Sequence, residues 1–107
     1  MTKIFKVNSW GTEEEIYLQK TSYSSNGRLA ITAVCAGYGE PFTKVTVNVD
    51  APLSGDESTH AFVDTNNNAD WGVEKVLQEN GFAKPTGKYA RSGFYEYPEY
   101  EFDLSKF

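Results

Sequence analysis

The fold is decided by residues 26–49, which read NGRLAITAVCAGYGEPFTKVTVNV. Two runs in this stretch, residues 29–35 and 42–49, place apolar side chains at every second position, as a β-strand with one buried face does. Asn26-Gly27 precedes the first run and is typical of a type I′ turn, because both residues tolerate positive φ. Residues 37–41, GYGEP, predict a second turn between the runs. The stretch therefore predicts consecutive antiparallel strands with one face in solvent.

The flanking sequence extends this pattern in both directions. Residues 3–8 form a short β-rich run that is broken at residues 10–12, and residues 14–21 again alternate apolar and polar side chains. Residues 50–59 have the composition of a loop, and residues 60–65 are once more β-rich. These runs predict further strands on both sides of the central pair.

One helix is predicted over residues 69–80. An apolar stripe with helical spacing begins at Val73, and Gly81 stands where a glycine commonly ends a helix. The asparagines at 66–68 are good candidates for the N-terminal cap, because their side chains can accept a hydrogen bond from an exposed helix N–H. Gly72 disfavours helix by up to about 1 kcal/mol relative to Ala, so we expect a loose first turn.

The C-terminal part contains an aromatic and acidic segment, FYEYPEYEFD, at residues 94–103. Apolar and acidic side chains alternate over residues 99–104, which predicts a strand with one buried face. Because Pro98 cannot donate to a ladder, this strand should begin after it or lie at a sheet edge. Residues 84–92 are expected to form a solvated loop. Together the patterns predict an α+β fold, an antiparallel β-meander with a single helix packed on it and a late C-terminal strand, in one domain over residues 1–107.

Composition and charge exclude several classes of protein. The chain has 39% hydrophobic and 15% aromatic residues, which is too apolar for a disordered tail. A single cysteine, Cys35, excludes an intramolecular disulfide and a Cys-rich zinc site, and its strand position predicts a buried small hydrophobe. The net charge of -5 argues against direct nucleic-acid binding. No apolar run approaches the roughly 20 residues of a membrane span, and the N-terminus lacks the apolar region of a signal peptide. These features predict a soluble, cytoplasmic domain without a cofactor.

The acidity is concentrated in the second half of the chain. Residues 1–55 contain five acidic and five basic side chains, whereas residues 56–107 contain ten and five. Carboxylates two positions apart on a strand stand about 6.6 Å apart, so a row of them rimmed by tyrosine could occupy a basic groove of a protein partner. The predicted partner-binding residues are Tyr95, Glu96, Tyr97, Glu99, Glu101 and Asp103. The alternative is an exposed strand face whose charges discourage edge pairing.

A second hypothesis is a small ligand-binding or enzymatic site. His60 and Asp64 lie four positions apart in a predicted strand and would share a face, where a carboxylate can orient an imidazole. The loop from Lys84 to Arg91 carries three basic side chains that could hold phosphate. No second histidine, nucleophile motif or metal-ligand spacing accompanies them, so neither catalysis nor a metal is expected. A third hypothesis is a structural accessory protein that dimerises through an edge strand.

The sequence HAFVDTNN at residues 60–67 resembles a family of small uncharacterised proteins encoded on plasmids, conjugative elements and phages of Gram-positive bacteria. YPEYEFDL at residues 97–104 agrees in the same order, as do shorter pieces between them. That family has no agreed activity or catalytic residues. Its setting resembles that of anti-defence genes, and some small acidic proteins of such elements look like inhibitors of host nucleases. The resemblance implies a non-enzymatic anti-CRISPR inhibitor in the bacterial cytoplasm, which binds a basic nucleic-acid-handling surface of a CRISPR effector nuclease.

Overall fold

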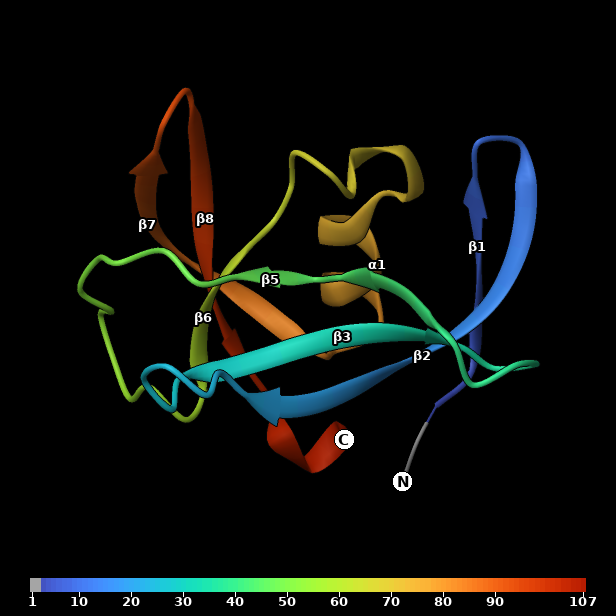
Figure 1. Cartoon of the computed structure of the whole chain (residues 1–107), viewed down its shortest axis with the longest axis horizontal. Coiled ribbons are helices and arrows are strands. Elements are labelled where there is room, and N and C mark those ends of the chain that lie inside the picture. The colour runs from blue at the N-terminus through green and yellow to red at the C-terminus, as the bar shows by residue number, and fades with distance from the viewer. Residues whose placement is uncertain (1–2) are drawn as a thin grey trace.

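A computed structural model describes residues 3–107, whose strands form two four-stranded antiparallel sheets (Figure 1). The first sheet has the order β1-β2-β3-β4, with the bounds β1 Phe5–Ser9, β2 Thr12–Ser22, β3 Leu29–Cys35 and β4 Pro41–Lys44. The second has the order β5-β6-β8-β7, with the bounds β5 Thr46–Val47, β6 His60–Val63, β7 Ala83–Ser92 and β8 Tyr95–Phe102. The helical elements are η1 Ala69–Trp71, α1 Val73–Glu79 and η2 Leu104–Lys106. The predicted α+β class with its single α-helix is confirmed.

The chain passes from one sheet to the other at Val45. The run at residues 42–49 was predicted as one strand, but it divides into β4 and β5, which belong to different sheets. Val45 lies between them and is fully buried. Its N–H donates to the carbonyl of Ile31 at 2.9 Å, and its carbonyl accepts from the N–H of Asp64 at 2.8 Å. Both backbone polar groups of Val45 are therefore hydrogen-bonded, one to β3 and the other to the residue that follows β6.

Two apolar clusters hold the molecule together. The larger takes side chains from both sheets and from α1, and the smaller contains Val49, Phe62, Ala90 and Tyr97. Apolar side chains from the 50–59 segment pack against the smaller cluster. The central strand β8 contributes to both clusters, so it is buried on both faces instead of the one face that its alternation predicts.

The predicted helix exists but is interrupted. Gly72 adopts φ +68° between η1 and α1, so the first turn is not α-helical. The prediction that an asparagine caps the helix is wrong, since no side-chain cap bond forms. Asn68 is instead fully buried. Its Nδ2 donates to the carbonyls of Lys44 and Asp64, and its Oδ1 accepts from Thr43 and Trp71. These bonds join the end of β4 to the helical segment.

Two predictions for the C-terminal half are also wrong. Residues 84–92 are not a loop, because they belong to β7, and Pro98 lies inside β8, the central strand of its sheet. Pro98 is tolerated because the pairing of β8 with β6 covers only Glu99 to Glu101 and stops before the proline. In the pairing of β8 with β7, a register shift between Pro85 and Tyr89 interrupts the ladder next to Pro98.

The turn between β2 and β3 also differs from the prediction, whereas the predicted turn between β3 and β4 is confirmed. Gly27 has φ +74° but Asn26 does not have a positive φ, so a longer connection replaces the expected type I′ turn. The β1–β2 turn has that character instead, because Trp10 and Gly11 both adopt positive φ. Cys35 is half-buried. Its partial burial raises the pKa of its thiol, and the negative charges of Glu14 and Glu40 raise it further. No helix within residues 3–107 is long and apolar enough to cross a membrane.

Candidate binding surface on the β7–β8 hairpin

The outer part of the β7–β8 hairpin is a two-stranded arm. Pairing of β8 with β6 ends at Glu99, whereas pairing with β7 continues from Tyr89↔Pro98 to Ser92↔Tyr95. Figure 1 shows this arm projecting from the body at the upper left. Gly93 makes the turn with φ +63°, a conformation that suits a residue without a Cβ. The end of the arm therefore projects from the body, whereas Ala90 and Tyr97 of the same arm pack in the smaller apolar cluster.

The arm exposes large aromatic side chains. Phe94 is 94% exposed, Tyr89 is 60% exposed and Tyr95 is 49% exposed. Arg91 and Glu96 are exposed at paired positions beside them. By the strand register, Tyr89 lies with Arg91 and Glu96 on one face of the hairpin, whereas Tyr95 lies on the other face and Phe94 at the turn. Phenylalanine, tyrosine and arginine are enriched at protein interfaces, so a hairpin end that exposes them on both faces is a candidate interaction site. We call this set of five residues the aromatic tip.

A buried carboxylate fixes the base of the arm. Between Pro85 and Tyr89, three residues of β7 face only Glu99 of β8. Thr86 Oγ1 donates to Glu99 Oε1 at 2.6 Å, and the N–H of Ser54 donates to Glu99 Oε2 at 2.7 Å. The Ser54 hydroxyl also donates to Oε1. Glu99 is fully buried, so it joins β7, β8 and the 50–59 segment.

The hydrogen bonds keep Glu99 ionised. Burial opposes ionisation and would raise the pKa of this carboxyl, but the bonds from Ser54 and Thr86 outweigh it, and the pKa lies below its usual value. The ammonium of Lys88 donates to the carbonyl of Pro52, which ties the 50–59 segment to β7 a second time. The arm is thus anchored to the body at both strands.

The structure separates the six predicted partner-binding residues. Tyr95 and Glu96 lie on the aromatic tip, whereas Tyr97 is buried in the smaller apolar cluster and Glu99 is buried at the base of the arm. The ring of Tyr97 packs near the ring of Tyr95, with the two ring centroids 6.5 Å apart. The remaining two carboxylates line a groove elsewhere. The expected exposed row of carboxylates does not form, because the 50–59 segment covers the face of β8 that carries Glu99.

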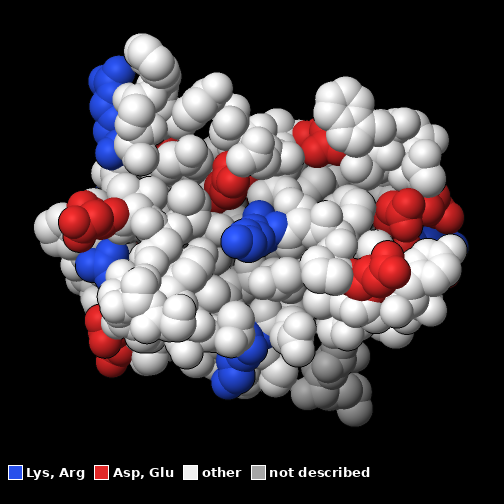
Figure 2. Space-filling model, in the orientation of Figure 1, with Lys and Arg blue, Asp and Glu red and all other residues white. Residues whose placement is uncertain are grey.

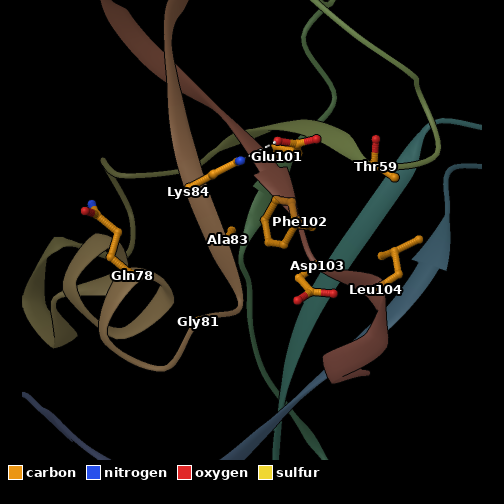
Figure 3. Close-up of a pocket in the computed structure, with 9 residues that line it drawn as sticks. All are labelled: Thr59, Gln78, Gly81, Ala83, Lys84, Glu101, Phe102, Asp103 and Leu104. Atoms are coloured by element: carbon orange, nitrogen blue, oxygen red, sulfur yellow. Dashed lines mark ion pairs between the residues drawn. The ribbon is translucent and has the colours of Figure 1, made fainter.

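The groove has a volume of about 610 Å³ and lies where β7, β8 and α1 meet (Figure 3). Glu101 and Asp103 line it together with Lys84, Gln78 and apolar side chains. Lys84 Nζ lies 3.3 Å from Glu101 Oε1, an ion pair that Figure 3 marks with a dashed line. Asp103 accepts hydrogen bonds from the hydroxyl and N–H of Ser105, and these bonds lower the pKa of Asp103. Both carboxylates therefore have partners within the fold.

The residues of the second hypothesis do not converge. His60 Nδ1 lies 2.9 Å from Thr59 Oγ1 and 3.1 Å from the carbonyl of Asp56, and a Cβ on Gly55 would overlap the imidazole ring. Asp64 instead accepts two hydrogen bonds from Asn67. Within residues 3–107 no group of three or more His, Cys, Asp or Glu side chains could hold a metal ion.

Most acidic side chains of the second half have a hydrogen-bond or ion-pair partner within the fold. Eight of the ten have a side-chain hydrogen bond or an ion pair, and they are Asp56, Asp64, Asp70, Glu74, Glu79, Glu99, Glu101 and Asp103. On the face in Figure 2, acidic side chains gather mainly at the right-hand end, over the β1–β2 hairpin, and elsewhere they are separated by neutral surface. Exposed aromatic character, more than negative charge, therefore distinguishes the aromatic tip.

Comparison with known families gives a match over most of the chain. A sequence profile described as "Domain of unknown function (DUF4313)" matches residues 17–107. The chain belongs to this family. The matched residues include the aromatic tip and the groove, and they exclude β1 and the β1–β2 turn. No curated protein and no solved structure matches the chain.

Tyr89, Arg91 and Phe94 belong to the aromatic tip, although the alternation of the sequence does not single them out. The signal that could have located them is Ser92-Gly93, a turn dipeptide between two segments that carry tyrosine. Pro85 and Gly87 disfavour a regular strand, so the sequence predicts a loop over residues 84–92 and does not predict this hairpin.

Proposed function

We propose that this chain is a non-enzymatic binding protein whose contact surface is the aromatic tip. The observation that carries the proposal is the exposure of Phe94, Tyr89 and Tyr95 on one projecting arm. Burying one such side chain contributes roughly 1.5–3 kcal/mol, which the free protein forgoes and a complex would gain. A partner with an apolar pocket for Phe94 fits this hairpin end, and Tyr89, Arg91 and Glu96 on one face and Tyr95 on the other would meet the rim of that pocket.

The anchored base of the arm favours such a role. The bonds of Glu99 and Lys88 fix the arm before any partner arrives. Less conformational entropy is then lost on binding, so more of the contact energy contributes to affinity. Glu99 and Tyr97 thus act as positioning residues for Tyr95 and Glu96, and would not touch the partner themselves.

We propose further that the partner is a CRISPR effector nuclease and that the chain is an anti-defence protein of a mobile element. The motifs at residues 60–67 and 97–104 support this through the resemblance described above. The net charge of -5 favours a basic partner and predicts fast, salt-sensitive association. The proposed contact has an aromatic centre, with charge supplied by Glu96 and by the overall field of the domain.

A pull-down against CRISPR effector nucleases, with and without guide RNA, tests this proposal. We expect capture by the natural chain and loss of capture by a Phe94→Ser/Tyr95→Ser variant. Tyr38→Ser is the matched control, because Tyr38 is an exposed aromatic residue in the turn between β3 and β4. Failure to bind any effector from a plausible host would contradict the choice of partner. Binding that survives the double substitution would contradict the choice of surface.

The groove supports a second candidate function, binding of a small molecule. Its volume of about 610 Å³ lies in the range of ligand pockets, and Lys84 and Gln78 offer polar groups beside an apolar floor. A fragment screen by amide NMR tests it. Shifts confined to residues 83–84 and 101–104 would support a site here, and shifts confined to the aromatic tip would contradict it.

A further inference from the structure

The β1–β2 turn contains a tryptophan in an unfavourable backbone conformation. Trp10 and Gly11 are the two residues between the paired positions Ser9 and Thr12, and they adopt φ +53° and +78°. Trp10 is the only non-glycine residue among residues 3–107 with a positive φ. A two-residue turn of this kind favours Asn-Gly, since a bulky side chain is strained there.

The Trp10 side chain buries little surface within the fold that would offset this strain. Its side chain is 89% exposed, so the indole ring has given up little of its contact with water. Trp71, the other tryptophan, is buried and donates its ring N–H to Asn68 Oδ1 at 3.0 Å. A strained residue that is also an exposed large aromatic points to a role outside the stability of the fold.

The surroundings of Trp10 are acidic. Residues 5–15 contain three glutamates, Glu13 to Glu15, and a single base, Lys6. Lys6 lies 3.6 Å from Glu13 and is paired across the strands with Glu15, so three glutamates against one lysine leave the hairpin with an excess of negative charge. Asp70 of η1 also approaches the hairpin, where it accepts a hydrogen bond from Ser9 at 2.7 Å. Figure 2 shows acidic side chains gathered at this end of the molecule.

We propose that Trp10 is a docking point for an arginine on a basic protein surface. The face of an indole ring attracts a guanidinium group, and the excess of glutamate over lysine in this hairpin supplies a field of the opposite charge. Charge complementarity thus selects the occupant, and the exposed ring supplies the contact. This docking point is separate from the aromatic tip. The two hairpins lie at opposite ends of the molecule in Figure 1, and Trp10 lies outside the family match.

The first test compares stability. Trp10→Asn places the favoured Asn-Gly pair in the turn, so we expect its urea midpoint to rise above that of the natural chain. Trp10→Phe keeps an aromatic ring and the strain, so we expect its midpoint to stay close to that of the natural chain. A lower midpoint for Trp10→Asn would show that the indole stabilises the fold, and it would overturn the proposal.

The second test measures binding of a hexa-arginine peptide by NMR of the indole N–H groups. We expect the Trp10 signal to shift on titration while the Trp71 signal, which reports a buried ring, stays in place. Trp10→Asn should weaken the affinity about two- to fivefold, the size of an exposed cation–π contact, and Trp10→Phe should weaken it less.

A control variant makes this test specific. Tyr38→Asn removes another exposed aromatic side chain, outside both hairpin ends, and should leave hexa-arginine binding unchanged. The readout is the Trp10 signal and not capture of a nuclease, so this proposal can fail while the proposed function stands. An unchanged affinity for Trp10→Asn, or equal shifts at both indoles, would overturn it.

Discussion

The carboxylate of Glu99 is buried and is held by hydroxyl and backbone N–H donors from two other segments. Glu99→Ala removes their common acceptor, so we expect the free energy of unfolding to fall by about 2–3 kcal/mol, because hydrogen bonds to charged groups are the stronger ones. Urea denaturation measures this loss. Glu96→Ala is the control on the same strand and should change stability by less than about 0.5 kcal/mol. Equal effects of the two substitutions would contradict the assigned role of Glu99.

The pH dependence of stability gives a second prediction for Glu99. Its pKa in the folded state lies below the usual 4.5, so the folded state favours the ionised form. This stabilisation is fully present above the usual pKa and is lost as the pH falls through the lower folded value. Glu99→Gln lacks the titrating group, so the stability difference between it and the natural chain should shrink from pH 7 to pH 3. A difference that stays constant with pH would contradict this origin.

Residue patterns alone could not have placed Glu99 correctly. Alternation in residues 99–104 assigns the glutamate to a wet face, and locally that is sound. What buries Glu99 is Ser54, which is 45 positions away in the sequence. The same holds for Trp10. The neighbouring Gly11 indicates a turn in the sequence, but the exposure of the Trp10 side chain depends on how the whole β1–β2 hairpin is placed.

At the scale of elements, the Gly72 junction distinguishes the observed helix from the predicted one. Gly72 has φ +68°, a conformation that costs an ordinary residue about 1–2 kcal/mol. We therefore expect Gly72→Ala to lower the free energy of unfolding by about that amount, measured in urea. In a continuous helix over residues 69–80, the same substitution would raise stability by up to about 1 kcal/mol. A stabilised variant would thus contradict the interrupted helix.

Strands that depend on local alternation were predictable, and strands that depend on distant partners were not. The runs that became β2, β3 and β6 are visible in the sequence. The division of residues 42–49 between two sheets is not visible, because it depends on bonds from Val45 to residues in both. The β7 strand was missed since Pro85 and Gly87 suggest a loop, and only its pairing with β8 shows that they form a shifted register.

At the scale of the whole molecule, the family match does not include all of the folding unit. β1 precedes the matched residues, yet Val7 is buried in the larger core and the ring of Phe5 packs 5.6 Å from that of Phe82. Deleting residues 1–11 should therefore lower the free energy of unfolding by roughly 3–6 kcal/mol, from about 1.5–3 kcal/mol for each of two apolar side chains. Urea denaturation of the shortened chain measures this. Unchanged stability would show that β1 is dispensable.

The whole molecule also shows where the negative charge of the sequence is used. The sequence places the excess in the second half, but most of those carboxylates serve as hydrogen-bond acceptors within the fold. The two hairpins proposed as contact surfaces lie at opposite ends of a molecule whose longest extent is 36 Å. In this proposal the acidity contributes a general field, and the exposed aromatic residues make the contacts.

Calorimetric titration of a CRISPR effector nuclease with the natural chain and with Phe94→Ser tests the central proposal most directly. We predict binding by the natural chain and at least about 30-fold weaker binding by the variant, as for a hot-spot residue worth 2 kcal/mol. The free energy of unfolding should stay within about 0.5 kcal/mol, because Phe94 is 94% exposed. Equal affinity of the two proteins, or no binding by the natural chain, would contradict the account.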